Sequence, residues 1–95
     1  MVWTLALSGP VFADKEAFVE ACLSSSNLER AICECCAAKA EAELSPLGFE
    51  FLTASLQGDH AKTAQLRGQL QIPEAMKTGM FMVNAPKRCA EEIGP

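Results

Sequence analysis

The sequence predicts an all-α fold, a small bundle of four or five short helices held together by disulfides. Apolar residues recur every three or four positions along most of the chain, as they do on the buried face of a helix. Capping residues and prolines divide this pattern into short segments. Five cysteines in 95 residues are typical of small exported domains, whose small cores need crosslinks. The length allows a single helical domain, expected at residues 14–95.

The first helix is expected at residues 15–24. Asp14 precedes it as a capping residue. Phe18, Ala21 and Cys22 follow at the spacing that places side chains on one helix face. A serine-rich turn at residues 24–27 is expected to separate this helix from the next one.

A second helix is expected from residue 27 to about residue 44. Ser26, followed three residues later by Glu29, matches the capping box that begins many helices. The segment is rich in Ala and Glu, which favour helix, as does Lys39. One stripe of this helix consists of Leu28, Ile32, Cys35, Lys39 and Ala42.

Ser45 and Pro46 predict the start of a third helix, because a serine cap followed by proline at the first helical position is a common start. Gly58 is expected to end this helix. Apolar side chains surround most of its circumference, which predicts a central place in the bundle. They are Leu47, Phe49, Phe51, Leu52 and Leu56.

Two further helices are expected after Gly58. Asp59 is placed to cap a fourth one that ends near residue 70 and has few large apolar residues. Residues 72–74, Ile-Pro-Glu, open a fifth, in which Pro86 is expected to produce a kink or a split. The expected stripe of the fifth helix is Met76, Met80 and Val83, and the last piece carries Cys89 and Ile93 on one face.

Residues 1–13 have the features of the end of a secretory signal peptide. The uncharged apolar run at 2–7 is followed by small residues at the positions that signal peptidase reads, Val11 and Ala13. No basic residue precedes the run, which is shorter than the usual ~7–15 residues, so we expect Met1 to lie inside a longer natural signal. The alternative is a short buried segment of the folded domain.

The cysteines are Cys22, Cys33, Cys35, Cys36 and Cys89. In an exported chain they are expected to form disulfides. Because successive helical residues are about 100° apart, Cys33 and Cys35 point to opposite sides of the second helix. We therefore expect Cys22 and Cys89 each to bridge to one of this pair, which leaves Cys36 as a buried free thiol. Which partner each one takes stays open.

The charge of the chain argues against two classes of partner. The net charge is −4, and the basic residues are scattered, whereas nucleic-acid binding requires clustered Lys and Arg. An anionic membrane surface would repel the chain for the same reason. The apolar run at residues 2–7 is much shorter than the ~20 residues that span a bilayer. We expect no nucleic-acid partner and no membrane span.

The cluster from Cys33 to Cys36 contains both Cys-x-Cys and Cys-x-x-Cys. A thiol-redox or copper-binding role is therefore one hypothesis, since methionines at 76–82 could add soft sulfur ligands for Cu(I). A redox pair requires an exposed thiolate of lowered pKa. These cysteines instead lie inside a predicted helix next to Glu34, so structural disulfides are the favoured interpretation.

Catalysis has little support in the sequence. His60 is the one histidine, so any Ser-His or Cys-His centre would have to use it. It lies at a predicted helix start, where a solvated position is the simpler interpretation, and no familiar hydrolase or phosphate-binding motif occurs. We expect no enzymatic activity and no cofactor.

A binding or interaction module remains, located in the periplasm or secreted. Phe49 and Phe51 point to opposite sides of the third helix, which allows one of them to be exposed. Together with Met80 or Met82 it would form an apolar patch for another protein. Burial of both phenylalanines between neighbouring helices is the favoured alternative.

Overall fold

The computed structural model describes residues 14–94 and contains five α-helices and no strand in that part of the chain. They are α1 (Lys15–Ser25), α2 (Arg30–Glu43), α3 (Pro46–Gln57), α4 (His60–Arg67) and α5 (Ile72–Ile93). The predicted all-α, disulfide-linked bundle is confirmed. The signal-like segment, residues 1–13, lies outside the described residues.

Three of the predicted caps begin the helices to which the sequence assigns them. The side chains of Asp14, Ser45 and Asp59 each accept a hydrogen bond, 3.0 Å long, from the backbone N–H three residues later. Each bond satisfies a donor that the first turn of a helix leaves without an intrahelical partner. Gly58 ends α3 at φ 75°, in the left-handed region that glycine adopts without strain.

The capping box predicted for α2 is wrong. The helix begins at Arg30, and its first flanking residue, Glu29, makes no side-chain capping bond. The hydroxyl of Ser26 instead donates to the carbonyl of Cys22 at 2.6 Å, at the end of α1. Ser26 therefore serves the end of the preceding helix, because that carbonyl also needs a partner.

The predicted split at Pro86 is also wrong, since α5 runs as one helix of 22 residues from Ile72 to Ile93. Proline removes one backbone hydrogen bond from a helix interior and typically costs about 3 kcal/mol. Two fully buried residues, Ala85 and Cys89, flank Pro86 on one side of α5. Their packing, together with the disulfide of Cys89, holds the two halves together as one continuous helix.

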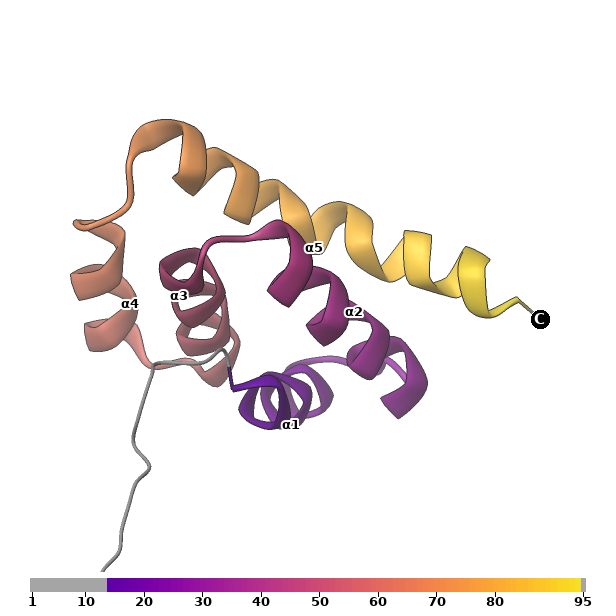
Figure 1. The fold of residues 1–95 in the computed structure, drawn as a ribbon. Helices are drawn as coiled ribbons and strands as arrows, with labels where there is room; N and C mark the ends of the chain where they lie inside the picture. Colours follow the sequence, from indigo (N-terminus) through magenta and orange to yellow (C-terminus); the bar gives the residue numbers. More distant parts are fainter. Residues whose placement is uncertain (1–13, 95) are drawn as a thin grey trace, which may run out of the picture.

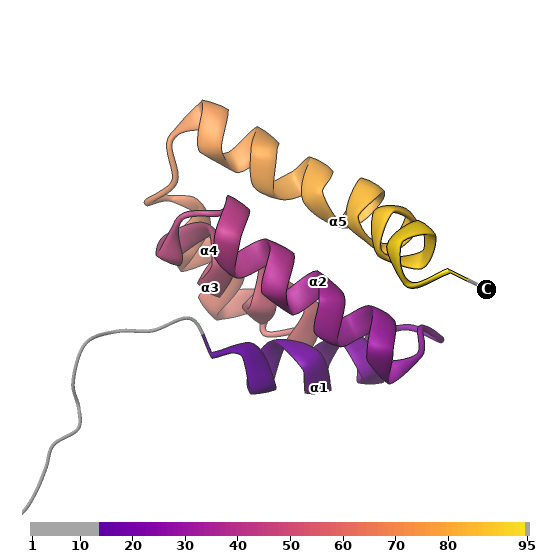
Figure 2. The same ribbon diagram turned by 45° about the vertical axis from the view of Figure 1, so that its right-hand side comes forward.

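The helices form three levels around one core. Helices α2 and α3 occupy the middle, with α1 packed on one side of both and α5 on the other, while α4 packs against α3 (Figure 1). Figure 2 shows α2 between α1 and α5. The aromatic centre of the core is Phe18 against Phe49, with ring centroids 5.4 Å apart. The other large or sulfur-containing core residues are Cys22, Cys33, Cys36, Leu44, Leu52, Phe81 and Cys89.

The rotation of α5 differs from the prediction. The residues that it buries are Thr78, Phe81, Ala85 and Cys89. The predicted stripe of Met76, Met80 and Val83 lies on the opposite side of the helix and is exposed. The prediction that this stripe packs on the bundle is therefore wrong. The disulfide of Cys89 and the burial of Phe81 turn the other face inward.

Helices α3 and α5 approach closely at Gly48. A methyl group on this residue would lie 2.8 Å from Thr78 Oγ1 and 3.3 Å from Ser45 Oγ. We expect Gly48→Ala to destabilise the protein by about 1–3 kcal/mol, because Thr78 is fully buried and has little room to move. Alanine favours helix more than glycine does, so without a steric conflict the substitution would stabilise the protein. The expected loss of stability therefore comes from the conflict with Thr78.

Urea unfolding of Gly48→Ala in two backgrounds checks this explanation. The destabilisation should fall by at least about 1 kcal/mol when Thr78 is replaced by alanine, since the conflicting oxygen is then gone. An equal cost with Thr78 present or removed would show that the helices do not meet there.

Candidate functional site

Two disulfides connect three of the helices. Cys22–Cys33 joins α1 to α2, and Cys35–Cys89 joins α2 to α5, with Cα atoms 5.9 Å apart in both pairs. Cys33 and Cys35 are two residues apart, so their side chains leave α2 in nearly opposite directions. The bridged residues are the four that the sequence assigns to disulfides, and the structure now gives each its partner.

The fifth cysteine, Cys36, is a free thiol that is fully buried in the core. Burial raises the pKa of this thiol above its ordinary value, and the positive charge of Lys39 opposes that rise only in part. The thiolate is the reactive form of cysteine. Cys36 is therefore both inaccessible and protonated at neutral pH.

We expect Cys36 to react with iodoacetamide at least about a hundredfold more slowly in the native protein than in denaturant, because alkylation must wait for the structure to open. The measurement is the alkylated fraction against time by intact mass, at neutral pH without reductant. Rapid labelling of the native protein would show an accessible thiol and would revive a redox or metal role for the cluster.

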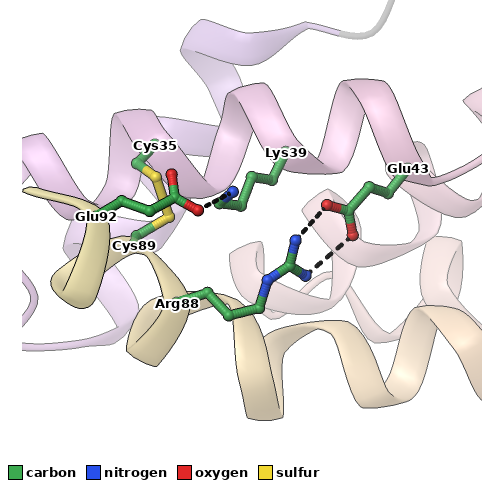
Figure 3. A network of polar contacts seen from close by, with 6 residues as sticks. All are labelled: Cys35, Lys39, Glu43, Arg88, Cys89 and Glu92. Atoms are coloured by element: carbon green, nitrogen blue, oxygen red, sulfur yellow. Dashed lines mark hydrogen bonds and ion pairs between the residues drawn. A yellow bond between two sulfur atoms is a disulfide. The ribbon is translucent and has the colours of Figure 1, made fainter.

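Two ion pairs lie beside the disulfide between α2 and α5, through Lys39 and Glu43, which follow Cys35 at successive turns of α2 (Figure 3). Lys39 Nζ lies 2.6 Å from Glu92 Oε2. The guanidinium of Arg88 donates to both carboxylate oxygens of Glu43, at 3.1 and 2.6 Å. Such partly exposed pairs contribute little stability singly. Their geometry, together with the disulfide, holds α5 in one rotation against α2.

The Arg88–Glu43 pair predicts a small acid sensitivity. Hydrogen bonding to Arg88 lowers the pKa of Glu43 from its ordinary 4.5. A carboxylate whose pKa is lower in the folded state stabilises that state above the ordinary pKa, and this contribution disappears as the pH falls through the lowered value. In urea titrations, Arg88→Gln should be less stable than the parent at pH 6–7, and the difference should disappear as the pH falls below 4.5 and through the lowered pKa of Glu43. A stability gap that is unchanged at low pH would contradict this.

A shallow pocket of about 280 Å³ lies between α1 and α2. Its lining consists of Lys15, Glu16, Val19, Arg30, Glu34 and Ala37. Ion pairs to Glu41 and Glu20 engage the two basic residues. The lining contains no cysteine, serine or histidine, and within residues 14–94 no group of three or more potential ligands is placed to hold a metal ion. The pocket offers no nucleophile paired with a base.

The outer side of α5 carries a row of exposed apolar side chains, which we call the α5 stripe. It consists of Ile72, Met76, Met80 and Val83, with exposed fractions of 77, 65, 55 and 68%. Their spacing of four, four and three residues places them on one helix face. Single exposed apolar residues are ordinary on protein surfaces, whereas a contiguous row of large ones is typical of an interaction site.

The predicted partner-binding residues are distributed unevenly. Met80 lies within the α5 stripe. Phe49 is buried against Phe18 and is not available to a partner. Phe51 and Met82 are half-buried. The structure therefore does not bring the four residues together into one exposed patch. The expected alternative, burial of the phenylalanines, describes Phe49 well and Phe51 in part.

Sequence reasoning missed two features of the stripe. Ile72 was expected at the start of the fifth helix but not as part of its stripe, although its spacing to Met76 continues the row by one turn. Met76 and Val83 were assigned to the core because periodicity identifies an apolar face but not its direction. The direction depends on which other residues of α5 have partners on α2 and α3.

Comparison with protein-family models, curated proteins and solved structures finds no match to this chain. Among the described residues, no helix combines the length and the apolar character needed to cross a bilayer. Function must therefore be inferred from the residues and their placement.

Proposed function

We propose that the protein is an exported module without catalytic activity that binds another protein chain through the α5 stripe. The observation that carries the proposal is the orientation of α5. This orientation buries the face of Phe81 and Cys89 and exposes the α5 stripe of Ile72, Met76, Met80 and Val83. Exposing four large apolar side chains is unfavourable in water. Such a face is consistent with a surface that a partner covers.

The rigidity of α5 supports this proposal. The Cys35–Cys89 disulfide and the pairs of Lys39 and Arg88 attach the second half of the helix to α2. The first half packs on α3 through Thr78. A partner would therefore meet a preformed helix face, and little conformational entropy would be lost on binding.

Export to the periplasm or the extracellular space is supported by two features. Residues 1–13 have the pattern of the end of a signal peptide. The two disulfides form and persist in oxidising compartments. Together they favour a domain that folds outside the reducing cytoplasm.

The alternative, a thiol-redox or copper-binding role for Cys33–Cys36, receives less support. Two of the three cysteines in the cluster, Cys33 and Cys35, are in disulfides with other helices. The third, Cys36, is buried with a raised pKa. A redox role requires an accessible thiolate, and a copper site built on this cluster requires accessible cysteine sulfur as ligand. The cluster provides neither at the surface.

Site-specific photocrosslinking in the natural host tests the proposal. A photoreactive amino acid at Met80 should give an adduct of defined mass, and Val83→Lys in the same chain should abolish it. The same probe at Gln65, exposed on α4, is the control and should give no such adduct. Equal labelling at both positions, or no adduct at Met80, would reject the α5 stripe as a binding surface.

A further inference from the structure

We infer that the occupant of the α5 stripe is a second copy of this chain, with the two α5 helices antiparallel and Met80 of each seated over Gly79 of the other. This inference rests on the proposed function and names the partner of the same surface. A symmetric pair of this kind uses one patch twice, which is the commonest arrangement among soluble oligomers.

The order of residues along the stripe is self-complementary. In an antiparallel pair of α5 helices, the two-fold axis passes between Gly79 and Met80. Met80 of one copy then lies opposite Gly79 of the other, and Met76 lies opposite Val83. The same operation places Ile72 opposite Lys87, whose aliphatic stem can cover an apolar side chain while its charge stays in water. Each large side chain of one copy therefore meets a small, a branched or a flexible one of the other.

Gly79 has no evident role within the chain itself. It lies in the interior of α5, where glycine is unfavourable. Its backbone does not require glycine, because the positive-φ glycines of the described residues are Gly58 and Gly94. A Cβ atom at Gly79 would meet nothing within 4 Å. The missing side chain of Gly79 leaves a gap on the exposed face of α5. The close approach of a second helix would explain why a glycine is found there.

The charge on α5 permits two copies to meet. The whole chain carries −4, which would oppose association through most of its surface. Helix α5, by contrast, has three basic and three acidic residues and is neutral as a unit. Arg88 and Glu92 are already paired with α2. In the antiparallel register Lys77 lies opposite Met82 and Lys87 lies opposite Ile72, so no two like charges are opposed.

The size of the stripe fits a weak, concentration-dependent dimer. Its four side chains are each more than half exposed, and together they offer roughly 500 Å² per copy. Two copies would bury roughly 1,000 Å², the lower limit for a specific interface. We therefore expect a dissociation constant in the micromolar range, on the order of 10–100 µM.

Sedimentation equilibrium of the purified, oxidised full chain, from roughly 1 µM to 1 mM, tests this. We expect a monomer–dimer equilibrium. Met80→Lys should weaken it at least about tenfold, because it places a charge at the centre of the contact. Gln65→Lys adds the same charge on α4 and should leave it unchanged. A dimer that Met80→Lys does not weaken would overturn the inference.

Gly79→Leu distinguishes this pairing from general stickiness. Leucine favours helix more than glycine, and its Cβ would meet nothing within 4 Å in the single chain, so the variant should fold at least as well. It fills the gap that receives Met80 and should weaken the dimer at least about tenfold. A nonspecific apolar patch would associate more strongly after this change, and that result would overturn the antiparallel register.

The remaining outcomes separate this inference from the proposed function. A chain that stays monomeric throughout, while Met80 crosslinks to a different protein, overturns the second copy but leaves the binding surface standing. A monomer in which Met80 crosslinks to residues 1–13 of its own chain overturns both. A monomer without any crosslink at Met80 also overturns both.

Discussion

Replacing Cys35 and Cys89 together by serine is expected to lower the free energy of unfolding by about 4 kcal/mol. The bridge closes a loop with a sequence separation of 54, and the entropy that a crosslink removes from the unfolded chain grows with loop length. Small domains have about 5–15 kcal/mol in total, so this one change removes a large share. Urea unfolding of the parent and the variant measures it.

The matched comparison is the double serine variant of Cys22 and Cys33. This bridge spans a separation of 11, so its removal should cost about 3 kcal/mol, less than the longer bridge. Both variants are best made with Cys36→Ala, which prevents the free thiol from entering new disulfides. A larger loss for the short loop than for the long one would contradict the connectivity or the entropic explanation.

Phe18→Ala is expected to destabilise the protein by about 3–5 kcal/mol. Phe18 is fully buried and packs on Phe49 at the meeting of α1 and α3. Truncation loses the transfer free energy of the ring and leaves a cavity that the neighbouring helices can fill only in part. The midpoint and slope of urea unfolding, followed by circular dichroism, give the difference.

Phe51→Ala is the matched control, since Phe51 belongs to α3 but is only half-buried. We expect it to cost clearly less than Phe18→Ala, because part of the ring already contacts water. A loss below about 1 kcal/mol for Phe18→Ala, or an order reversed between the two, would contradict the position of the core.

Helix starts were the most predictable part of this fold because their chemistry is local. Asp14, Ser45 and Asp59 each act within three residues of their own position. Gly58 likewise ends α3 through its own backbone. Signals of this kind depend on neighbours in the sequence, so the residues alone are enough to recognise them.

The failed predictions at Ser26 and Pro86 have different causes. The hydroxyl of Ser26 donates to the carbonyl of Cys22 at the end of α1 and accepts from the N–H of Leu28 in the following loop, so it does not cap α2. Pro86 was expected to interrupt α5, but the buried neighbours Ala85 and Cys89 hold the helix together. Tertiary packing outweighed a local preference at Pro86, whereas at Ser26 one local hydrogen bond formed in place of another.

The candidate site shows the same division between local patterns, which the sequence predicts, and packing between helices, which it does not. The repeat of Met76, Met80 and Val83 could be identified in the sequence, while its direction could not. That direction follows from the disulfide of Cys89 with Cys35, which is 54 residues away along the chain. Because a kink or split was expected at Pro86, the inward face that Cys89 marks was not extended to residues 72–83, and the outward orientation of the α5 stripe was missed.

The most direct test of the account is a non-reducing peptide map of the protein isolated from its natural host, alkylated under denaturing conditions. Glutamyl endopeptidase cleaves after Glu34, between Cys33 and Cys35, and so separates the two bridges. The account predicts a chain beginning at Asp14, linked peptides for Cys22–Cys33 and Cys35–Cys89, and alkylation of Cys36 alone. Three or more alkylated cysteines, or Cys36 in a bridge, would contradict the bridged bundle on which the orientation of α5 depends.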